Sequence, residues 1–432
     1  MAATRKPVSL PGWSTNLLAG LAAFCIYSAM YAFRKPFTAA SYEGVRFAGA
    51  DFKVWAVIIQ TIGYTASKFA GISFIGSITR EKRARFIIKL ILAAWVALFF
   101  FGVFPPPWNL LFLAVNGFTL GFIYGLVFAY LEGRRSTELL GAVLAASFIF
   151  ASGFAQSAGK FLLLRTSVSE WWMPWLTGLL FLIPLIVFTW LLDRLPDPGP
   201  LDKQARTPRV PMSRRERNQF VRKFLPGLAL LVFTYVLLTI ARDYRSNFAA
   251  AIWKETGHGQ SAAVFIYSEL PATFVVLLIT GSLFLIRNNL HAFLINHILI
   301  IAGLILAALT TALYTAGLLG TLAWMMLSGA GLYVAYVPFN GMLFERMIAV
   351  FRCAGNAGFI IYIADAFGYL GSDAVLLYKS FAAATSSWVG FLVQLIYITA
   401  CTGIIATALA AAYFKRKYKL SKQTHFPIAV YG

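Results

Sequence analysis

The sequence is poor in charge. Only 12% of its 432 residues are Asp, Glu, Lys or Arg, whereas a soluble domain usually carries about 25%. Hydrophobic residues make up 59% of the chain. These proportions exclude a soluble globular domain. Because the apolar residues gather in blocks of about 20, the length that crosses the hydrocarbon of a bilayer, the sequence predicts membrane-spanning helices.

Cysteine is scarce as well. The three cysteines, Cys25, Cys353 and Cys401, lie in apolar segments without the spacing of metal ligands, so they predict neither a disulfide framework nor a metal site. The sequence has no nucleophile elbow and no phosphate-binding glycine loop. We therefore expect no enzyme activity and no cofactor. A cleavable signal peptide is also lacking, since the first apolar block, near Leu17, has the length of a span.

Acidic residues are the rarer charged class, with 16 Asp and Glu against 37 Lys and Arg. A net charge of +21 can indicate a nucleic-acid partner, but here the basic residues form short clusters between the apolar blocks. Such placement is typical of topology signals in membrane proteins. It excludes a nucleic-acid partner and leaves the lipid bilayer as the surroundings of the chain.

The apolar blocks predict twelve spans. They cover residues 14–36, 54–76, 86–104, 108–131, 139–162, 172–193, 225–246, 262–286, 291–315, 319–344, 353–378 and 388–414. These blocks are too long for the strands of a membrane barrel, so the fold class is an all-α membrane protein.

Basic residues predict the orientation. Alternate loops, including both ends of the chain, hold most of them: Arg5, Lys6, Arg80, Lys82, Arg83, Arg85, Lys89, Arg134, Arg135, Arg194 to Lys223, Arg287, Arg346, Arg352 and Lys415 to Lys422. The other loops hold few. Under the positive-inside rule both termini are cytoplasmic, which requires an even number of spans. We expect a bacterial inner membrane, given the compact loops.

A charged, proline-containing stretch divides the chain near its middle. It predicts a linker with a short amphipathic helix over Arg214 to Lys223. The expected divisions are a first six-helix bundle over 1–193, a cytoplasmic linker over 194–223, a second six-helix bundle over 224–414 and a cytoplasmic tail over 415–432.

The two predicted halves resemble each other. An offset of 208 residues places Tyr27 on Tyr235 and Arg34 on Arg242. A similar offset aligns the fourth and tenth spans, with Tyr124 on Tyr336. Two parallel repeats of this kind are typical of transporters whose solute site lies between the halves, near the bilayer midplane.

Charged side chains inside spans are costly and mark candidate functional sites. The basic ones are Arg34, Lys35, Lys68, Arg242 and Arg245, and the acidic ones are Asp243, Glu269 and Asp365. The first and seventh spans share the spacing i, i+4, i+7, which defines one helix face: Tyr27, Tyr31 and Arg34 in one, Tyr235, Thr239 and Arg242 in the other. Two such arginines facing each other suit a divalent oxyanion.

Structural alternatives stay open for each charge. Arg34 and Lys35 can snorkel to the interface at the end of the first span. Arg242 can pair with Asp243 or Asp365, and Lys68 with a carboxylate elsewhere in the bundle. For Arg245, snorkelling is the expectation. The carboxylates balance the arginines or carry a coupling proton.

Several motifs resemble the organophosphate:inorganic-phosphate antiporter branch of the major facilitator superfamily. The first span has YSAMYAFRKPF (27–37), similar to Tyr-x-x-x-Tyr-x-x-Arg-Lys-x-Phe in that branch. The second has GYTASKF (63–69), the tenth YVP (336–338), and the eleventh RCAGNAGFIIYIADAFGYLGS (352–372). The resemblance covers most of the chain and implies a major facilitator fold without catalytic residues.

By position, the resemblance implies that Arg34 and Arg242 bind phosphate and that Tyr27, Tyr31 and Lys68 line the central cavity. From the internal repeat we also expect Tyr235, the counterpart of Tyr27, to bind the solute. The chain departs from the branch elsewhere. Phe150 stands near the position of a histidine in the fifth span, FIYG (122–125) replaces a Trp- and Pro-containing run, and Arg80 replaces an acidic residue.

We therefore predict a secondary transporter of a small anionic solute, by organophosphate or phosphate exchange through alternating access, acting as a monomer. One alternative is a proton-coupled symporter of a carboxylate or sugar acid, for which Asp365, Glu269, Asp243 and Lys35 are the candidates for coupling or charge balance. Another is a membrane anion receptor that does not transport, which the altered fourth and fifth spans favour.

Overall fold

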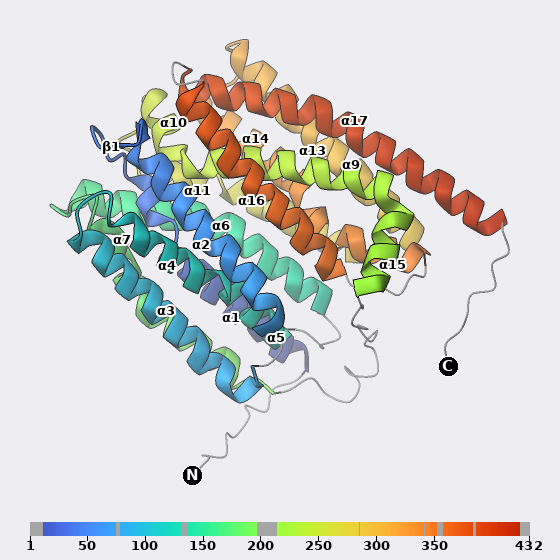
Figure 1. The fold of residues 1–432 in the computed structure, drawn as a ribbon, viewed down its shortest axis with the longest axis horizontal. Helices are drawn as coiled ribbons and strands as arrows, with labels where there is room; N and C mark the ends of the chain where they lie inside the picture. The colour runs from blue at the N-terminus through green and yellow to red at the C-terminus, as the bar shows by residue number, and fades with distance from the viewer. Residues whose placement is uncertain are drawn as a thin grey trace.

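The structure is a computed structural model that describes residues 12–74, 78–131, 137–196, 214–284, 286–340, 342–351, 357–382 and 386–423. The described chain is helical apart from one short hairpin, in which β1 (Arg46–Phe47) pairs antiparallel with β2 (Ala50–Asp51). Figure 1 shows two groups of helices side by side, the first half of the chain from blue to green and the second from green to red.

The first half supplies eight helical segments. They are α1 (Gly12–Tyr31), the short 3-10 helix η1 (Pro36–Ala39), α2 (Phe52–Phe74), α3 (Arg80–Val103), α4 (Leu110–Gly121), α5 (Ile123–Leu131), α6 (Thr137–Arg165) and α7 (Met173–Asp193).

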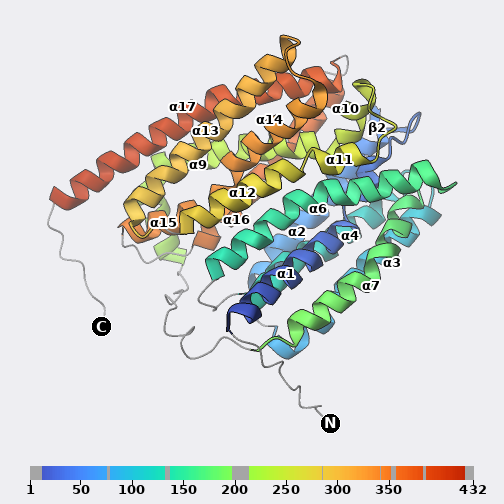
Figure 2. The same ribbon diagram turned by 180° about the vertical axis from the view of Figure 1, so that it is seen from behind.

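The second half supplies the rest. They are α9 (Arg214–Asn247), α10 (Ala249–Glu255), α11 (Ala263–Tyr267), α12 (Leu270–Phe284), α13 (Asn289–Thr315), α14 (Thr321–Tyr336), the short helix η3 (Val337–Asn340), α15 (Met342–Phe351), α16 (Ala357–Phe381) and α17 (Trp388–Gln423). Figure 2 shows α9 to α17 grouped on the far side of α6 from α3 and α7.

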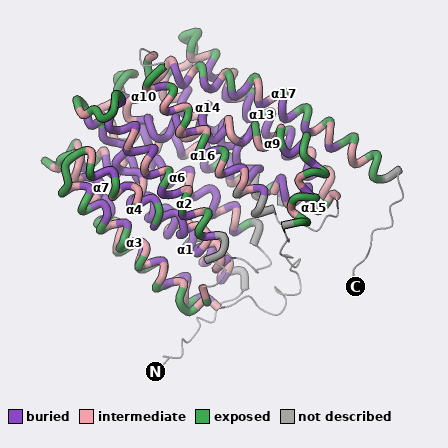
Figure 3. Tube along the Cα trace, viewed as in Figure 1, coloured by how far each residue is buried: buried purple, intermediate pink, exposed green. Residues whose placement is uncertain are grey.

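Each of the twelve predicted spans overlaps one to three consecutive helical segments of the described chain. Within the described ranges, nine helices are long and apolar enough to cross a membrane by length and composition. The other three predicted spans correspond to α1, α2 and α16. Buried residues fill the interior of each half, as Figure 3 shows, and large apolar side chains such as Ile183 (73% exposed) and Leu278 (74% exposed) cover the outside. An apolar exterior around a buried core is what a bilayer requires.

Chain connectivity gives the bundle two distinct ends. One end carries the starts of α3 and α9 and the end of α17, where the basic residues cluster, and we name it the basic end. The opposite end carries η1, the β1–β2 hairpin and α10. If the positive-inside rule holds, the basic end is cytoplasmic.

The helix predicted over Arg214 to Lys223 is present, but it is not separate from the seventh span. Residues 214–223 continue without a break into the seventh span, so α9 runs from Arg214 to Asn247 in one piece. Pro226 lies inside this helix. Gly227 packs against α17, with Phe414 carbons 2.6 Å from where its Cβ would be, so the helix is held by its neighbour at this point. Tertiary packing of this kind outweighs the helix-breaking preference of proline.

Close helix packing in the first half depends on glycine. A Cβ on Gly117 of α4 would lie 2.1 Å from the Gln60 carbonyl oxygen of α2. One on Gly121 would lie 1.7 Å from the Ser67 hydroxyl oxygen. Only glycine lets the two backbones approach so closely. This contact fixes α2, which carries part of the site, against the scaffold.

The first span changes direction where the site begins. α1 ends at Tyr31, and η1 starts at Pro36, which has no N–H to continue the helix. The carbonyl groups freed by this break have partners: the Asn116 amide donates to Phe33 O (3.0 Å) and the Gln60 amide donates to Arg34 O (3.0 Å). Two buried amides therefore hold the irregular turn that presents Arg34.

Candidate functional site

A cavity of about 360 Å³ lies between the two halves. Residues of α1, the turn after it, α2, α5 and α6 line it from the first half, and residues of α9, α14, η3, α15 and α16 line it from the second. It extends from Lys35 and Ser246 toward the basic end, as far as Gly141 and Glu345. Its volume suits a small organic molecule.

The cavity is closed at the end that lies away from the basic end. There Lys35 is buried and donates to Asn247 Oδ1 (2.5 Å) and to Ser246 Oγ (3.2 Å) of α9. Gln156 of α6 donates to the Ser246 carbonyl oxygen (2.7 Å). These bonds join the halves, so Lys35 closes the cavity rather than snorkelling at the membrane interface.

A further contact between the two halves lies at the surface of the end opposite the basic end. Lys254, in the last turn of α10, donates to the Glu43 carboxylate of the first half. Both side chains are 65% exposed, and this hydrogen bond lowers the pKa of Glu43 below its ordinary value. An exposed pair of this kind adds little stability.

Arg34 enters the cavity from the first half. Its guanidinium carbon lies 3.8 Å from the centre of the Tyr64 ring and 5.6 Å from that of Tyr31. Its Nε is buried without a hydrogen-bond partner. Among the described residues no carboxylate lies within ion-pair distance of it, so its charge is met only by ring faces.

Arg242 enters from the second half and is differently placed. Its Nη2 lies 2.8 Å from Asp243 Oδ1, and its guanidinium carbon lies 4.1 Å from the Tyr336 ring centre. Arg34, Tyr31 and Arg242 all line the cavity, so each half contributes an arginine to it. The pairing of Arg242 with Asp243 is one of the two alternatives left open by the sequence.

Lys68 and Asp365 also line the cavity, and they bind each other across the two halves. The distance from Lys68 Nζ to Asp365 Oδ2 is 2.8 Å. The other Asp365 oxygen, Oδ1, accepts a hydrogen bond from the Tyr235 hydroxyl, which lies 2.7 Å from the Tyr336 hydroxyl. Asp365 thus balances a lysine and not an arginine.

Tyr235 lies behind the cavity wall. It is 1% exposed and is not among the residues that line the cavity, because its hydroxyl is used by Asp365 and Tyr336. Its predicted place in direct contact with the solute is therefore corrected to a supporting one. Tyr27 and Tyr31 do line the cavity. That they bind a solute stays a prediction.

Glu269 balances an arginine, which is one of the two roles that the sequence left open for it. It does not line the cavity but accepts from Arg245 Nη1 at 2.6 Å. Arg245 is 1% exposed and donates further to the Met325 carbonyl oxygen (2.8 Å). The expectation that Arg245 snorkels is wrong: it forms a buried ion pair inside the second half, where Glu269 neutralises it. Nearby Gly329 leaves room for the guanidinium, since a Cβ there would lie 2.5 Å from Nη2.

The internal repeat is visible in the tyrosines. Tyr27 and Tyr124 meet edge to face with ring centres 5.5 Å apart in the first half. Their counterparts, Tyr235 and Tyr336, stack at 5.0 Å in the second. Both pairs join the first predicted span of a half to the fourth predicted span of the same half.

Sequence reasoning missed most of the aromatic lining. The residues that it did not assign to the site are Tyr64, Tyr124, Phe128, Phe148, Tyr333, Tyr336 and Tyr369. One signal was present, since Tyr64 precedes Lys68 by one helical turn. For the others, aromatic residues are common throughout the chain, and only the packing of the helices shows which ones face the cavity.

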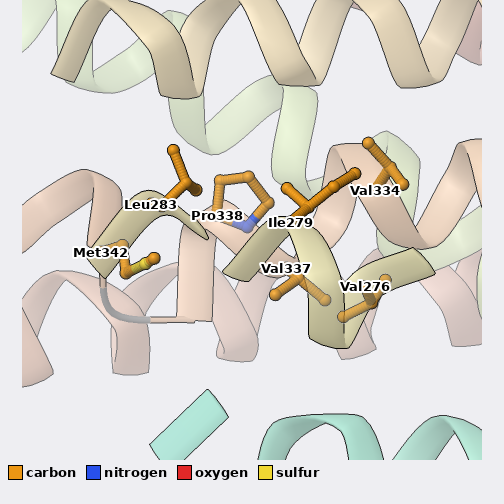
Figure 4. Close-up of a pocket in the computed structure, with 7 residues that line it drawn as sticks. All are labelled: Val276, Ile279, Leu283, Val334, Val337, Pro338 and Met342. Atoms are coloured by element: carbon orange, nitrogen blue, oxygen red, sulfur yellow. The ribbon is translucent and has the colours of Figure 1, made fainter. Parts of the chain in front are cut away.

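Two other hollows differ from this cavity in the polarity of their lining. One lies between α12 and the end of α14, is lined by apolar side chains (Figure 4) and has about 10 Å³ of space, roughly room for one water molecule. The other is an apolar groove on the outside of α9 and α16, lined by residues such as Phe233 and Phe367. Neither has the charged lining of the central cavity.

The described ranges contain no group of three or more His, Cys, Asp or Glu side chains that could hold a metal ion. The cavity wall supplies guanidinium, ammonium, carboxylate and phenol groups. Such a set binds and orients a polar solute.

Solved structures of transporters share this fold. A bacterial homologue of the human lysosomal transporter Spinster, inward-facing and unoccupied, matches with a TM-score of 0.59 at 14% identity, over 98% of this chain and 100% of that one. A D-xylose–proton symporter matches with a TM-score of 0.60 at 14% identity, over 92% and 97%. The inward-open xylose transporter XylE from E. coli matches with 0.55 at 15%, over 93% and 95%. The fold is therefore the twelve-span major facilitator fold, as predicted.

Sequence comparison is less specific. No curated protein matches the chain. Residues 36–417 match a sequence family described as a family of unknown function, DUF5690. The match covers nearly all of the spans and begins just after Arg34 and Lys35. It includes every cavity-lining residue that follows Lys35 in the chain.

Proposed function

Because the chain belongs to the DUF5690 family, whose function is unknown, we propose a function from the site: this integral membrane protein is a secondary transporter that moves a small organic anion by alternating access. The reaction we propose is exchange of an organophosphate against phosphate. We further propose a bacterial inner membrane as its location and a monomer as its working unit.

One observation carries the proposal. Arg34 projects into a cavity between the halves, its Nε is buried without a partner, and no described carboxylate pairs with it. A buried cation without a counter-ion is costly unless a ligand supplies the charge. A phosphate or carboxylate group would do so through bidentate, charge-assisted hydrogen bonds.

The position of the cavity supports alternating access. Hydrogen bonds at Lys35, Ser246 and Gln156 close the opposite end, whereas the cavity extends toward the basic end. Rocking of the two halves about the site would move the opening from one side to the other. An anion promotes this change only if it binds the intermediate arrangement more tightly than the open one.

The proposal is tested by counterflow in proteoliposomes. We expect uptake of labelled phosphate or glucose 6-phosphate that requires an anion inside the vesicle. Arg34→Lys keeps the charge but loses the planar fork, so we expect its exchange rate to fall at least about tenfold. Leu180→Ala, on the lipid-facing side of α7, is the matched control and keeps wild-type exchange.

Folded wild-type protein that exchanges none of these anions would overturn the exchange reaction. Exchange that is equally fast in Arg34→Lys and wild type would remove Arg34 from the site. Correct folding of each variant is checked by its elution in size exclusion and by its melting temperature.

Proton-coupled symport of a carboxylate or sugar acid is the second candidate. It is favoured by Asp365, a carboxylate that lines the cavity and joins the halves through Lys68. The D-xylose–proton symporter with the same fold shows that the architecture accommodates proton coupling. Uptake driven by a pH gradient, without internal anion, and lost in Asp365→Asn would favour symport over exchange.

A non-transporting anion receptor is the third candidate. The same vesicles distinguish it: a receptor binds the labelled anion, and the bound amount saturates at one anion per protein without internal accumulation. Accumulation beyond that ratio would exclude this candidate.

A further inference from the structure

Four cations and two paired carboxylates share the inner part of the cavity. The cations are Arg34, Lys35, Lys68 and Arg242, and the carboxylates are Asp243 and Asp365. A third carboxylate, Glu345, lines the cavity near the basic end. Each of the two inner carboxylates neutralises one cation, so the charges are not equally available to a ligand.

Asp243 binds one edge of the Arg242 guanidinium. Its Oδ1 accepts from both Nε (3.2 Å) and Nη2 (2.8 Å) of the guanidinium. This is one of the two edges through which a guanidinium can hold a carboxylate or phosphate by two parallel bonds, and the Asp243 charge also neutralises that of Arg242. The two side chains are 12% and 15% exposed, so solvent screens the pair only in part.

Arg34 offers the contrasting case. Its guanidinium rests on the Tyr64 ring, its Nε is buried without a hydrogen bond, and within the described chain no carboxylate pairs with it. Lys35 beside it donates to neutral groups, the Asn247 amide oxygen and the Ser246 hydroxyl. The uncompensated positive charge is therefore concentrated at the closed end of the cavity.

We infer that the Asp243 carboxylate occupies the position at Arg242 that a second anionic group of a solute would otherwise take. Arg34 alone then binds the anionic head group of the solute, and the site selects anions that carry a single anionic group. A second anionic group on the solute would meet the Asp243 carboxylate and would have to displace it from Arg242. Asp243 is then a specificity-determining residue. This inference rests on the proposed function that the cavity binds an anion.

Selectivity is measured with matched probes on the purified full-length protein by titration calorimetry. Gluconate and glucarate have the same six carbons but one and two carboxylates, and glucose 6-phosphate and glucose 1,6-bisphosphate differ in the same way. We expect wild type to bind the single-headed member of each pair at least about tenfold more tightly. Asp243→Asn keeps the size of the side chain, and we expect it to remove that preference.

Asp51→Asn is the control, since Asp51 is an exposed carboxylate on the hairpin that does not line the cavity. It should keep the wild-type preference. An unchanged preference in Asp243→Asn, or a wild type that already prefers the two-headed probes, would overturn the inference while leaving anion binding intact.

Rescue provides an independent readout. Arg242→Gln leaves Asp243 as an unpaired negative charge in the cavity, so we expect at least about tenfold weaker binding of gluconate. The double variant Arg242→Gln/Asp243→Asn removes that charge, and we expect an affinity within about threefold of wild type. Arg34→Gln should lose binding with or without Asp243→Asn.

If both arginines held the head group equally, the double variant would bind as weakly as Arg242→Gln, and the inference would be wrong. A folded wild type that binds none of the four probes would overturn the proposed anion function itself. The two failures are therefore distinguishable.

Discussion

Lys68 in α2 and Asp365 in α16 form an ion pair that joins the two halves beside the cavity, with 2.8 Å between Nζ and Oδ2. The side chains are 20% and 10% exposed, so the pair is shielded from most of the solvent. One further contact accompanies it: the Tyr64 and Tyr369 rings of the same helices meet edge to face at 5.9 Å. α2 and α16 are thus held together where the halves must move relative to each other.

Neutralising one member of this pair should be worse than neutralising both. Lys68→Gln or Asp365→Asn leaves a half-buried charge without its partner, whereas the double variant leaves none. We expect a coupling free energy of about 1–3 kcal/mol in a double-mutant cycle of unfolding in mild detergent. Additive effects of the two substitutions would show that the pair contributes nothing to stability.

The buried pair of Arg245 and Glu269 should behave as a structural element. Glu269→Gln leaves the Arg245 guanidinium, which is 1% exposed, without its counter-charge. We expect a loss of about 3–5 kcal/mol in the free energy of unfolding. Because Glu269 does not line the cavity, the anion affinity of the folded fraction should stay within about twofold of wild type.

A changed anion affinity in Glu269→Gln, at unchanged stability, would return Glu269 to the site. Arg245→Met/Glu269→Leu is the companion variant. Replacing both charges by apolar side chains of similar size should recover most of the stability lost in Glu269→Gln.

Much of this fold was predictable from the sequence because a bilayer imposes simple rules. Apolar blocks of the right length located all twelve spans, and the cost of charge in a span singled out Arg34, Lys68 and Arg242. The linker helix was placed correctly in the chain, but its continuity with the seventh span was not predictable. Pro226 argues for a break there, and only the packing of Gly227 on α17 shows why none forms.

Partners across helices were the part that the sequence could not reveal. Asp365 and Lys68 lie far apart in the chain, as do Arg34 and its Tyr64 platform, and the rotation of each helix about its axis decides which side chains meet. Helix rotation depends on contacts such as Gly117 on Gln60, which act between spans. Periodicity within one span gives a face but not its neighbour.

The glycine contact between α4 and α2 should be intolerant of a single methyl group. In Gly117→Ala the Cβ would lie 2.1 Å from the Gln60 carbonyl oxygen, and backbone cannot move aside as a flexible side chain can. We expect a loss of about 3 kcal/mol or more in the free energy of unfolding. Gly281→Ala in α12 is the matched control, since nothing lies within 4 Å of its added Cβ. Equal melting temperatures of the two variants would contradict this account.

The Tyr64 ring should matter to anion binding through its face. It lies 3.8 Å below the Arg34 guanidinium, which it holds in place by a cation–π contact. Tyr64→Phe keeps that face, so we expect its affinity for the transported anion to stay within about threefold of wild type. Tyr64→Leu removes it and should cost about 1–2 kcal/mol of binding. Equal affinities of Phe and Leu variants in calorimetry would show that the ring only fills space.

The direction of the cavity can be measured by labelling. Gly141 lines the cavity toward the basic end, whereas Phe47, 41% exposed, lies on the hairpin at the opposite end. In a background with Cys25, Cys353 and Cys401 replaced by serine, we expect Gly141→Cys to react with a membrane-impermeant maleimide in inverted vesicles and Phe47→Cys to react in intact cells.

This pattern follows from two separate physical arguments, the positive-inside rule for the basic end and the hydrogen bonds of Lys35 for the closed end. If Gly141→Cys reacted from the same side as Phe47→Cys, the cavity would open at the end that Lys35 and Asn247 close. If both cysteines exchanged sides together, the basic end would face outward, and the orientation predicted from the lysines and arginines would be wrong. Added anion should slow the reaction of Gly141→Cys, because a bound solute shields the cavity and shifts the halves toward the arrangement that covers it.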